Sequence, residues 1–204
     1  MSNEFTAAIE GRELFLAADE IRQMTLPLDQ GGRHRLVIAD SASAGHVVAA
    51  LESCAGVGVL PADGGLLGAL TVADNFALAL RYGSELDDIR RDELDLAAAF
   101  RLCGLTAERV VMLGRAQPMN LERIERWTLG FVRWLLRPPE LLVIDRLFVG
   151  LARRQAEALI ALEMVYHRRH PFRTVLFVDL DSHELPELPE CRSLIRLAET
   201  LCHC

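Results

Sequence analysis

The sequence predicts an α/β fold in which a mostly parallel β-sheet carries an inserted helical subdomain. Short, uninterrupted apolar runs of strand length recur along the chain, which is typical of strands buried on both faces. Segments with helical periodicity lie between these runs, and this alternation favours a parallel sheet covered by helices. The length of 204 residues suits one globular unit with a sizeable core.

The N-terminal part is expected to begin with strands and to continue with a strand–loop–helix unit. Two apolar stretches, Leu14–Ala18 and Met24–Leu28, precede a pair of glycines and indicate strands with a turn. Arg35–Ala39 indicates a short buried strand, and Asp40–Gly45 indicates a loop of small residues. A helical pattern follows over His46–Cys54. This order is the frame of a phosphate-binding turn.

The middle of the chain is predicted to be mainly helical. A strand at Val57–Leu60 leads into a glycine-bearing loop at Ala62–Gly68. Thr71 and Asp74 then have the spacing of a capping box, with Asp in place of Glu, and indicate the start of a helix. Helical periodicity continues over Asn75–Leu136, with breaks at glycines and at one proline.

The C-terminal part returns to alternating strands and helices. Leu141–Ile144 indicates a buried parallel strand with an acid, Asp145, at its carboxyl end. Ala152–His167 predicts a helix, Thr174–Val178 another buried strand, and Ser193–Leu197 a last strand. We therefore expect a single domain over residues 1–204, with a core at 1–74 and 138–204 and a helical subdomain at about 75–137.

Composition and charge exclude several classes of function. The net charge of −7 argues against binding to nucleic acid, which needs a basic surface. No apolar run reaches the ~18 residues that a membrane helix needs, and the N-terminal segment lacks the pattern of a signal peptide. We therefore expect a cytoplasmic protein. All 22 residues of the Lys+Arg count are arginines, so any chemistry that requires a lysine is excluded.

The five cysteines are expected to be reduced thiols. Their number is odd, and their spacing shows no paired pattern. The terminal residues Cys202, His203 and Cys204 carry metal-binding atoms, but three adjacent residues cannot close a tetrahedral site alone. We therefore expect no metal site there.

Several segments, in this order and spacing, resemble the nucleotide-binding subunit of ABC transporters, from the first strands to Leu197. Ala62–Asn75 is similar to the Q-loop of that family and the helix after it, and Pro139–Asp145 is similar to its Walker B strand. Asp145–Leu151 is similar to the segment that leads to the D-loop. Within it, Phe148–Gly150 resembles the branch that powers phospholipid transport of the Mla and Mce type. The resemblance implies a P-loop NTPase-like fold.

The stretch that matches the phosphate loop of the family departs from its pattern. That pattern, G-x-x-x-x-G-K-[ST], uses glycines so that backbone N–H groups wrap the phosphates, a lysine for their charge and a hydroxyl for Mg²⁺. Here alanines replace the glycines, Gly45 takes the lysine position, and His46 takes the hydroxyl position. Ser41 and Ser43 remain as candidate phosphate contacts, and Asp40 adds negative charge beside them.

The Q-loop and signature positions implied by the resemblance are also altered. Ala62 takes the place of the Q-loop glutamine. The signature L-S-G-G-Q aligns with the five residues from Leu121 to Glu125, with Glu122 and Arg123 in its second and third positions, so the serine and both glycines are lost. Glu122 would bring a carboxylate toward a γ-phosphate. The resemblance therefore implies a signature that repels nucleotide.

The Walker B region keeps one acid and loses the catalytic one. Asp145 matches the metal-binding aspartate of the family and would hold Mg²⁺ if any were bound. Arg146 takes the place of the catalytic glutamate, and a cation cannot act as a general base. Leu180 takes the place of the switch histidine. Of the nucleotide-contacting residues that the resemblance implies, Asp145 alone clearly remains.

The predicted helix after the signature-equivalent residues carries arginines and tryptophans in a periodic arrangement. These residues suit either a solvated stripe beside a core that holds the tryptophans, or a strip that docks a partner. The arginines are Arg123, Arg126, Arg133 and Arg137, and the tryptophans are Trp127 and Trp134.

These features predict a catalytically degenerate ATP-binding cassette that serves as a structural or regulatory subunit of an ABC transporter. The expected partners are a membrane permease subunit, an intact ATPase cassette, or both, and pairing as a homodimer or a heterodimer is left open. No cofactor is expected, and ATP and Mg²⁺ enter only if residual binding persists. The permease would be received by an apolar groove and would hold the chain at the inner face of the membrane. The groove residues are Leu66, Leu67, Leu70, Phe76 and Tyr82.

Two other interpretations stay open at this point. In one, the chain is a regulator that binds nucleotide through Ser41 and Ser43 without turnover. In the other, it is an ATPase that works through atypical residues, with Asp145 holding Mg²⁺.

Overall fold

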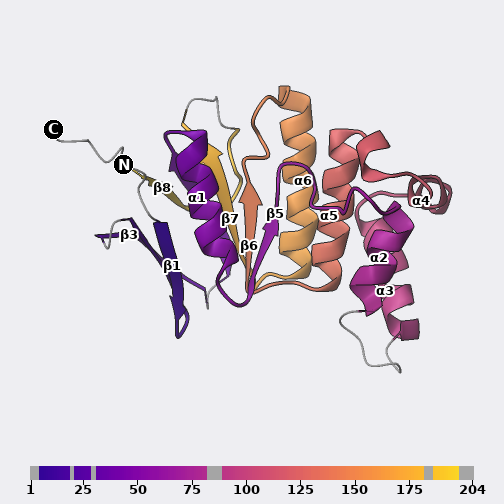
Figure 1. The fold of residues 1–204 in the computed structure, drawn as a ribbon, viewed down its shortest axis with the longest axis horizontal. Helices are drawn as coiled ribbons and strands as arrows, with labels where there is room; N and C mark the ends of the chain where they lie inside the picture. Colours follow the sequence, from indigo (N-terminus) through magenta and orange to yellow (C-terminus); the bar gives the residue numbers. More distant parts are fainter. Residues whose placement is uncertain (1–4, 19–20, 29–30, 82–88, 182–185, 198–204) are drawn as a thin grey trace. The chain divides into compact units, whose positions relative to one another are not determined.

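The computed structural model describes residues 5–18, 21–28, 31–81, 89–181 and 186–197 (Figure 1). The chain divides into two compact units. The sheet unit comprises Met1–Ala62, Pro138–Glu157 and His170–Cys204, and the helical unit comprises Asp63–Arg137 and Ala158–Arg169.

The sheet unit contains two β-sheets within its described residues. A three-stranded antiparallel sheet has the order β1-β2-β3, and a five-stranded sheet has the order β5-β6-β7-β4-β8 with every pairing parallel. The strands are β1 (Phe5–Glu10), β2 (Glu13–Ala18), β3 (Ile21–Pro27), β4 (Gly32–Ile38), β5 (Val57–Leu60), β6 (Leu141–Asp145), β7 (Thr174–Leu180) and β8 (Cys191–Arg196).

The three central strands of the parallel sheet are buried along their whole length. Every position of β4, β6 and β7 is buried, which explains the apolar runs Leu36–Ile38, Leu141–Ile144 and Val175–Val178. The buried charged residues of these strands include Arg35 of β4 and Asp179 of β7. One face of this sheet packs against helix α1 (Ser41–Glu52) and against the three-stranded sheet. The core between them includes Leu14, Leu16, Leu36, Ile38, Val47, Leu51, Val143, Leu176 and Val178.

The start of α1 corrects one expectation from the sequence. The segment Asp40–Gly45 is not a loop, because β4 ends at Ile38 and α1 already begins at Ser41. The Asp40 side chain caps the helix and accepts hydrogen bonds from the backbone N–H groups of Ala42 and Ser43. Small residues such as Ser and Ala fit a first helical turn as well as a loop, so only the cap distinguishes the two.

The helical unit is built from α2 (Val72–Arg81), α3 (Ile89–Leu102), α4 (Ala107–Gly114) and α5 (Arg123–Leu136), with a short 3₁₀ turn at Pro118–Asn120. Helix α6 (Arg153–Arg169) begins in the sheet unit and ends in the helical unit. None of the helices in the described part of the chain has the length and apolar character needed to cross a membrane.

The helix start predicted at Thr71 and Asp74 is present, with the N-cap half of the predicted capping box formed. The Thr71 hydroxyl donates to a carboxylate oxygen of Asp74 over 2.6 Å, and the Asp74 backbone N–H donates back to Thr71 Oγ1 over 3.1 Å. The strand predicted at Val57–Leu60 also matches β5 in both bounds. These agreements follow from local signals, a cap and an apolar run between turn residues.

Candidate functional site

The carboxyl end of β6 lies beside the first turn of α1 in the sheet unit. Asp145 is the last residue of β6 and is 5% exposed. Arg146 follows it with a positive φ of 48°, a backbone conformation that is uncommon for a residue other than glycine. Its backbone N–H donates to the carbonyl oxygen of Val178 in the neighbouring strand β7, over 2.8 Å. This geometry places the Arg146 guanidinium beside the Asp145 carboxylate at the end of β6.

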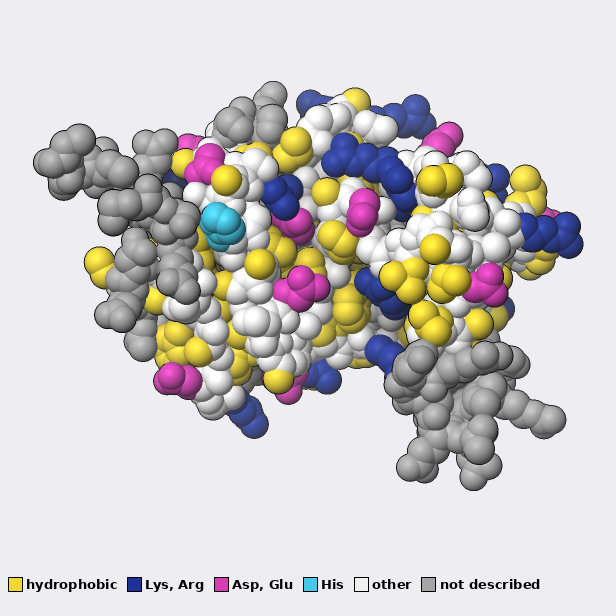
Figure 2. Space-filling model, viewed as in Figure 1, with side chains coloured by type: hydrophobic (Ala, Val, Ile, Leu, Met, Phe, Trp, Pro, Cys, Tyr) yellow, Lys and Arg dark blue, Asp and Glu magenta, His cyan; other side chains and the backbone are white. Residues whose placement is uncertain are grey.

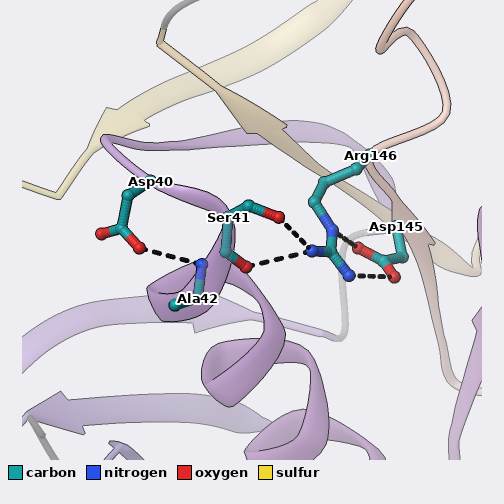
Figure 3. Close-up of polar contacts among 5 residues, drawn as sticks. All are labelled: Asp40, Ser41, Ala42, Asp145 and Arg146. Carbon is teal, nitrogen blue, oxygen red and sulfur yellow. Dashed lines mark hydrogen bonds and ion pairs between the residues drawn. The ribbon is translucent and has the colours of Figure 1, made fainter.

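The guanidinium group of Arg146 joins Asp145 to α1 (Figure 3). Its Nε and Nη2 atoms donate to the two carboxylate oxygens of Asp145 over 2.5 Å and 2.9 Å. Its Nη1 atom donates to the Ser41 carbonyl oxygen over 3.0 Å and to the Ser41 hydroxyl over 2.9 Å. The carboxylate of Asp145 raises the pKa of Arg146 through these hydrogen bonds, against the opposing effect of burial. Arg146 is therefore a fixed cation.

Two backbone N–H groups in the first turn of α1, those of Ala42 and Ser43, are already bonded. The Oδ1 atom of Asp40 accepts from the backbone N–H groups of Ala42 and Ser43, each over 2.9 Å, and Oδ2 accepts from the Ser43 hydroxyl over 2.6 Å. These bonds, first the one from the Ser43 hydroxyl, lower the pKa of Asp40, so the capping carboxylate is anionic. Free N–H groups at a helix start attract anions, but here the Asp40 carboxylate already occupies those of Ala42 and Ser43.

The other residues of the expected phosphate loop lie within α1. Gly45 and His46 are helical, and His46 is exposed. A side chain at Gly45 would meet no atom within 4 Å, so the fold does not require a glycine there. Ser41 is bonded to Arg146 and Ser43 to Asp40. The structure thus brings Ser41 together with Asp145, while His46 and Gly45 take no part in that cluster.

The remaining predicted positions of the sheet unit are buried or half-buried. Leu180 ends β7, is 7% exposed and belongs to the core that packs against α1. The resemblance places Ala62 at the Q-loop glutamine. Ala62 is half-buried and is the last residue of the first segment of this unit. The aromatic ring of Phe148 is buried and stacks on Phe177 with ring centroids 5.8 Å apart.

A second aspartate–arginine pair, which sequence reasoning missed, lies on the same sheet. Arg35 of β4 and Asp179 of β7 form an ion pair with 2.9 Å between Nε and Oδ2, and both side chains are buried. Arg35 also lies over the ring of Phe148, 5.6 Å from its centroid. Burial raises the pKa of Asp179 to about 6 and lowers the pKa of Arg35, and the attraction between the two charges only partly opposes each shift. A charged residue inside a buried strand was the available clue, because such a residue needs a partner.

An apolar groove is present within the helical unit, where the sequence places the partner-binding residues. Its volume is ≈ 300 Å³, and the loop that forms one wall is held by Asn75, which exchanges hydrogen bonds of 2.7 Å and 3.1 Å with the backbone of Leu67. Leu70 is half-buried and is not part of the wall, and Tyr82 lies outside the described residues. The lining residues are Gly65, Leu66, Leu67, Asn75, Phe76, Leu78, Ala79 and Arg133.

Hydrophobic side chains are also exposed on this unit. Leu67, Val111 and Met112 are 53%, 58% and 64% exposed, and Figure 2 shows hydrophobic side chains gathered over α2 and α4. A second apolar cavity of ≈ 390 Å³ is lined by residues of α2, α3, α4 and α5. Phe76 borders both cavities and packs edge-to-face on Phe100, so it serves mainly as a core residue.

The signature-equivalent residues form the start of α5. Leu121 is buried, and Glu122 is the N-cap, whose backbone N–H donates to the side chain of Glu125 over 3.1 Å. Arg123 lies over the ring of Trp127, 4.6 Å from its centroid. Arg133 donates to the carbonyl oxygen of Gly65 over 2.7 Å. Two arginines of the predicted docking strip are thus engaged by residues of their own unit.

The parallel sheet, the helix that follows β4 and the acid at the end of β6 define the P-loop NTPase-like cassette fold, as predicted. Comparison with solved structures finds this fold in ATP-binding cassettes of ABC transporters. The dimeric structure of MJ0796, a bacterial ABC transporter cassette, is 15% identical and has a TM-score of 0.60, covering 96% of this chain and 92% of that one.

Two other solved structures give similar values. The post-hydrolysis state of the MJ0796 cassette bound to ADP and Pi is 14% identical with a TM-score of 0.58, covering 96% of this chain and 92% of that one. The ATP-binding subunit of an ABC transporter is 16% identical with a TM-score of 0.58, covering 89% of this chain and 80% of that one. No protein-family model and no curated protein matches the sequence. At these identities the likeness establishes the fold.

Proposed function

We propose that this chain is a catalytically degenerate ATP-binding cassette that acts as a structural or regulatory subunit of an ABC transporter. The observation that carries the proposal is the guanidinium of Arg146, which stands at the position of the catalytic glutamate and binds both carboxylate oxygens of Asp145. A general base must accept a proton from the attacking water, and a guanidinium that is always charged cannot do so.

The phosphate side of the site supports the same proposal. A P-loop wraps phosphates with a long glycine-rich loop and a lysine, whereas only Ala39 and Asp40 separate β4 from α1 here. The chain contains no lysine to replace the lost charge. The two carboxylates of Asp40 and Asp145 outnumber the single guanidinium of Arg146, so the cluster keeps one net negative charge and repels a nucleotide.

The residues present do not fit a magnesium ion. Mg²⁺ requires oxygen ligands in near-octahedral geometry, but both carboxylate oxygens of Asp145 already accept hydrogen bonds from Arg146. His46, which takes the position of the metal-binding hydroxyl, is exposed on α1. Hydrolysis of ATP with Mg²⁺ is therefore not part of the proposed function.

The proposed partners are a membrane permease subunit and an intact cassette. The two MJ0796 structures are described as dimeric, and one is called an ABC transporter cassette. The apolar groove that includes Leu66, Leu67 and Phe76 supplies a surface for the permease, which would hold the chain at the inner face of the membrane.

Lipid transport is a narrower proposal. It rests on the resemblance of Phe148–Gly150 to the Mla and Mce branch, and the buried stacking of Phe148 on Phe177 gives that segment a packing role. An operon that encodes a permease and a lipid-binding subunit beside this chain would support it, and a neighbouring sugar or peptide transporter would contradict it.

The decisive experiment is a titration of the purified full chain with a fluorescent ATP analogue and Mg²⁺, together with an assay of phosphate release. We expect no binding tighter than about 1 mM and no phosphate release. Tight binding without release would instead indicate a nucleotide-binding regulator. Tight binding with release that Asp145→Asn abolishes would indicate an ATPase, and either result would overturn the proposal.

A second experiment addresses the partner. A photo-crosslinking residue introduced at Leu67, which is exposed in the groove, should yield products with an integral membrane protein in the native host. The same residue at Arg154, which is exposed on α6, serves as the matched control. Equal crosslinking at both positions would contradict docking at the groove.

A further inference from the structure

We propose that Asp145 and Ser41 form a binding site for a planar cation, and that the chain fills this site with its own Arg146. The internal guanidinium then replaces a metal–nucleotide complex as the group that links the end of β6 to the start of α1. This inference rests on the proposed function, since it explains how a cassette without nucleotide keeps this region ordered.

The acceptor atoms match a guanidinium in number and shape. The two carboxylate oxygens of Asp145 lie 2.5 Å and 2.9 Å from Nε and Nη2, which is the paired geometry that arginine makes with a carboxylate. The carbonyl and hydroxyl oxygens of Ser41 receive Nη1 over 3.0 Å and 2.9 Å. Lysine has a single nitrogen and cannot contact these separate acceptors in the same way.

The backbone is shaped to place this side chain. The φ of 48° at Arg146 lies in the left-handed region, which a residue with a side chain adopts only when other contacts hold it. The hydrogen bond from its backbone N–H to the Val178 carbonyl oxygen over 2.8 Å supplies one such contact, and the guanidinium bonds supply the others. Hydrogen bonds of both its backbone and its side chain thus hold Arg146 in this conformation.

Burial makes the cation necessary. The side chain of Asp145 is 8% exposed, whereas that of Arg146 is 23% exposed, so the carboxylate depends on the arginine more than the arginine depends on it. A buried carboxylate without a partner is strongly destabilising. Removal of the guanidinium should therefore create an empty cation site that a small guanidinium ion from solution can enter.

The test uses the full chain with Arg146→Ala and follows thermal unfolding. We expect Tm to fall by roughly 5 °C or more, because Asp145 loses its partner. Guanidinium chloride at a few millimolar should restore part of that loss in the variant and leave the wild type unchanged. Sodium chloride and urea at the same concentration are the controls, and neither should restore it. An unchanged Tm, or equal effects of the three additives, would overturn the inference.

A double variant shows whether Asp145 is the receptor. Arg146→Ala combined with Asp145→Asn should be more stable than Arg146→Ala alone and should not respond to guanidinium. If Arg146→Ala does not fold, Arg146→Gly replaces it, because glycine tolerates the φ of 48° at this position, and its Tm should rise with guanidinium in the same manner. A guanidinium response that persists in the double variant would contradict the assignment.

The outcome is separable from that of the proposed function. Phosphate release by the wild type would overturn the degenerate cassette whatever the variants do. A failure of guanidinium rescue in a wild type that releases no phosphate would overturn only the internal cation.

Discussion

Two aspartate–arginine pairs lie on the same parallel sheet, and their environments shift the pKa of the arginine in opposite directions. Asp145 and Arg146 are neighbours in the chain at the end of β6, and hydrogen bonding raises the pKa of that arginine. Arg35 and Asp179 pair across β4 and β7 in the interior, and burial lowers the pKa of that arginine and raises that of its aspartate. Hydrogen bonding thus favours the charged form of Arg146, whereas burial penalises the charges of both Arg35 and Asp179.

The comparison suggests different roles for the two pairs. The partly exposed guanidinium of Arg146 reaches Ser41 and so joins the end of β6 to the first turn of α1. Arg35 instead reaches the carbonyl oxygen of Pro186 over 2.8 Å and fastens a connecting segment to the interior of the sheet. Breaking each pair in turn should therefore separate a contribution to the site from a contribution to the core.

The largest expected effect comes from Asp179→Leu. This change leaves Arg35 buried without its carboxylate, and an arginine cannot shed its charge, so we expect a loss of about 3–5 kcal/mol in the free energy of unfolding. Urea denaturation at pH 7 measures it. The double variant Asp179→Leu with Arg35→Met should recover most of the loss. A double variant as unstable as the single one would show that the pairing itself is not responsible.

A pH dependence follows from the same pair. The pKa of Asp179 is raised from 3.8 to about 6, so the folded chain binds this proton more tightly than the unfolded chain does. The contribution of this group to stability is therefore greatest below about pH 4 and falls as pH rises to about 6, by at most roughly 3 kcal/mol. Urea midpoints across this range should decline in the wild type relative to Asp179→Asn. Parallel profiles for the two proteins would refute this assignment.

A smaller loss is expected for Arg146→Ala. Water can reach the carboxylate of Asp145 once the partly exposed guanidinium is gone, so we expect a loss of about 1.5–3 kcal/mol by urea denaturation. Hydrogen exchange should also accelerate at the first turn of α1, which Arg146 contacts through Ser41. A loss as large as that of Asp179→Leu would mean that the two pairs do not differ as described.

The smallest effect should come from Ser41→Ala. The substitution removes the hydroxyl that accepts from Arg146, but it keeps the carbonyl oxygen that accepts from the same nitrogen. The expected loss is at most about 1 kcal/mol, measured in the same urea series. A loss that exceeds that of Arg146→Ala would place the role of Ser41 in the helix start and not in the cation site.

Local sequence signals explain which expectations agreed with the structure. The strand Val57–Leu60 and the Thr71–Asp74 cap needed only neighbouring residues, and both were predicted with their bounds. The predicted start of α1 was wrong because the serines and the glycine of Asp40–Gly45 favour turns and caps, and this was given more weight than the helix preference of its alanines. The cap at Asp40 starts the helix at Ser41, but the resemblance to a phosphate loop favoured a loop at these residues.

By itself, the sequence determined the alternation of strands and helices, the absence of lysine and the arginine at position 146, because apolar periodicity and residue identity are properties of the chain. Only the tertiary structure decided which charges meet. Arg146 contacts Ser41 across 105 positions of sequence, and Arg35 meets Asp179 because β4 and β7 are adjacent in the sheet. Side-chain direction and strand order depend on the packing of the whole sheet, and no local pattern encodes them.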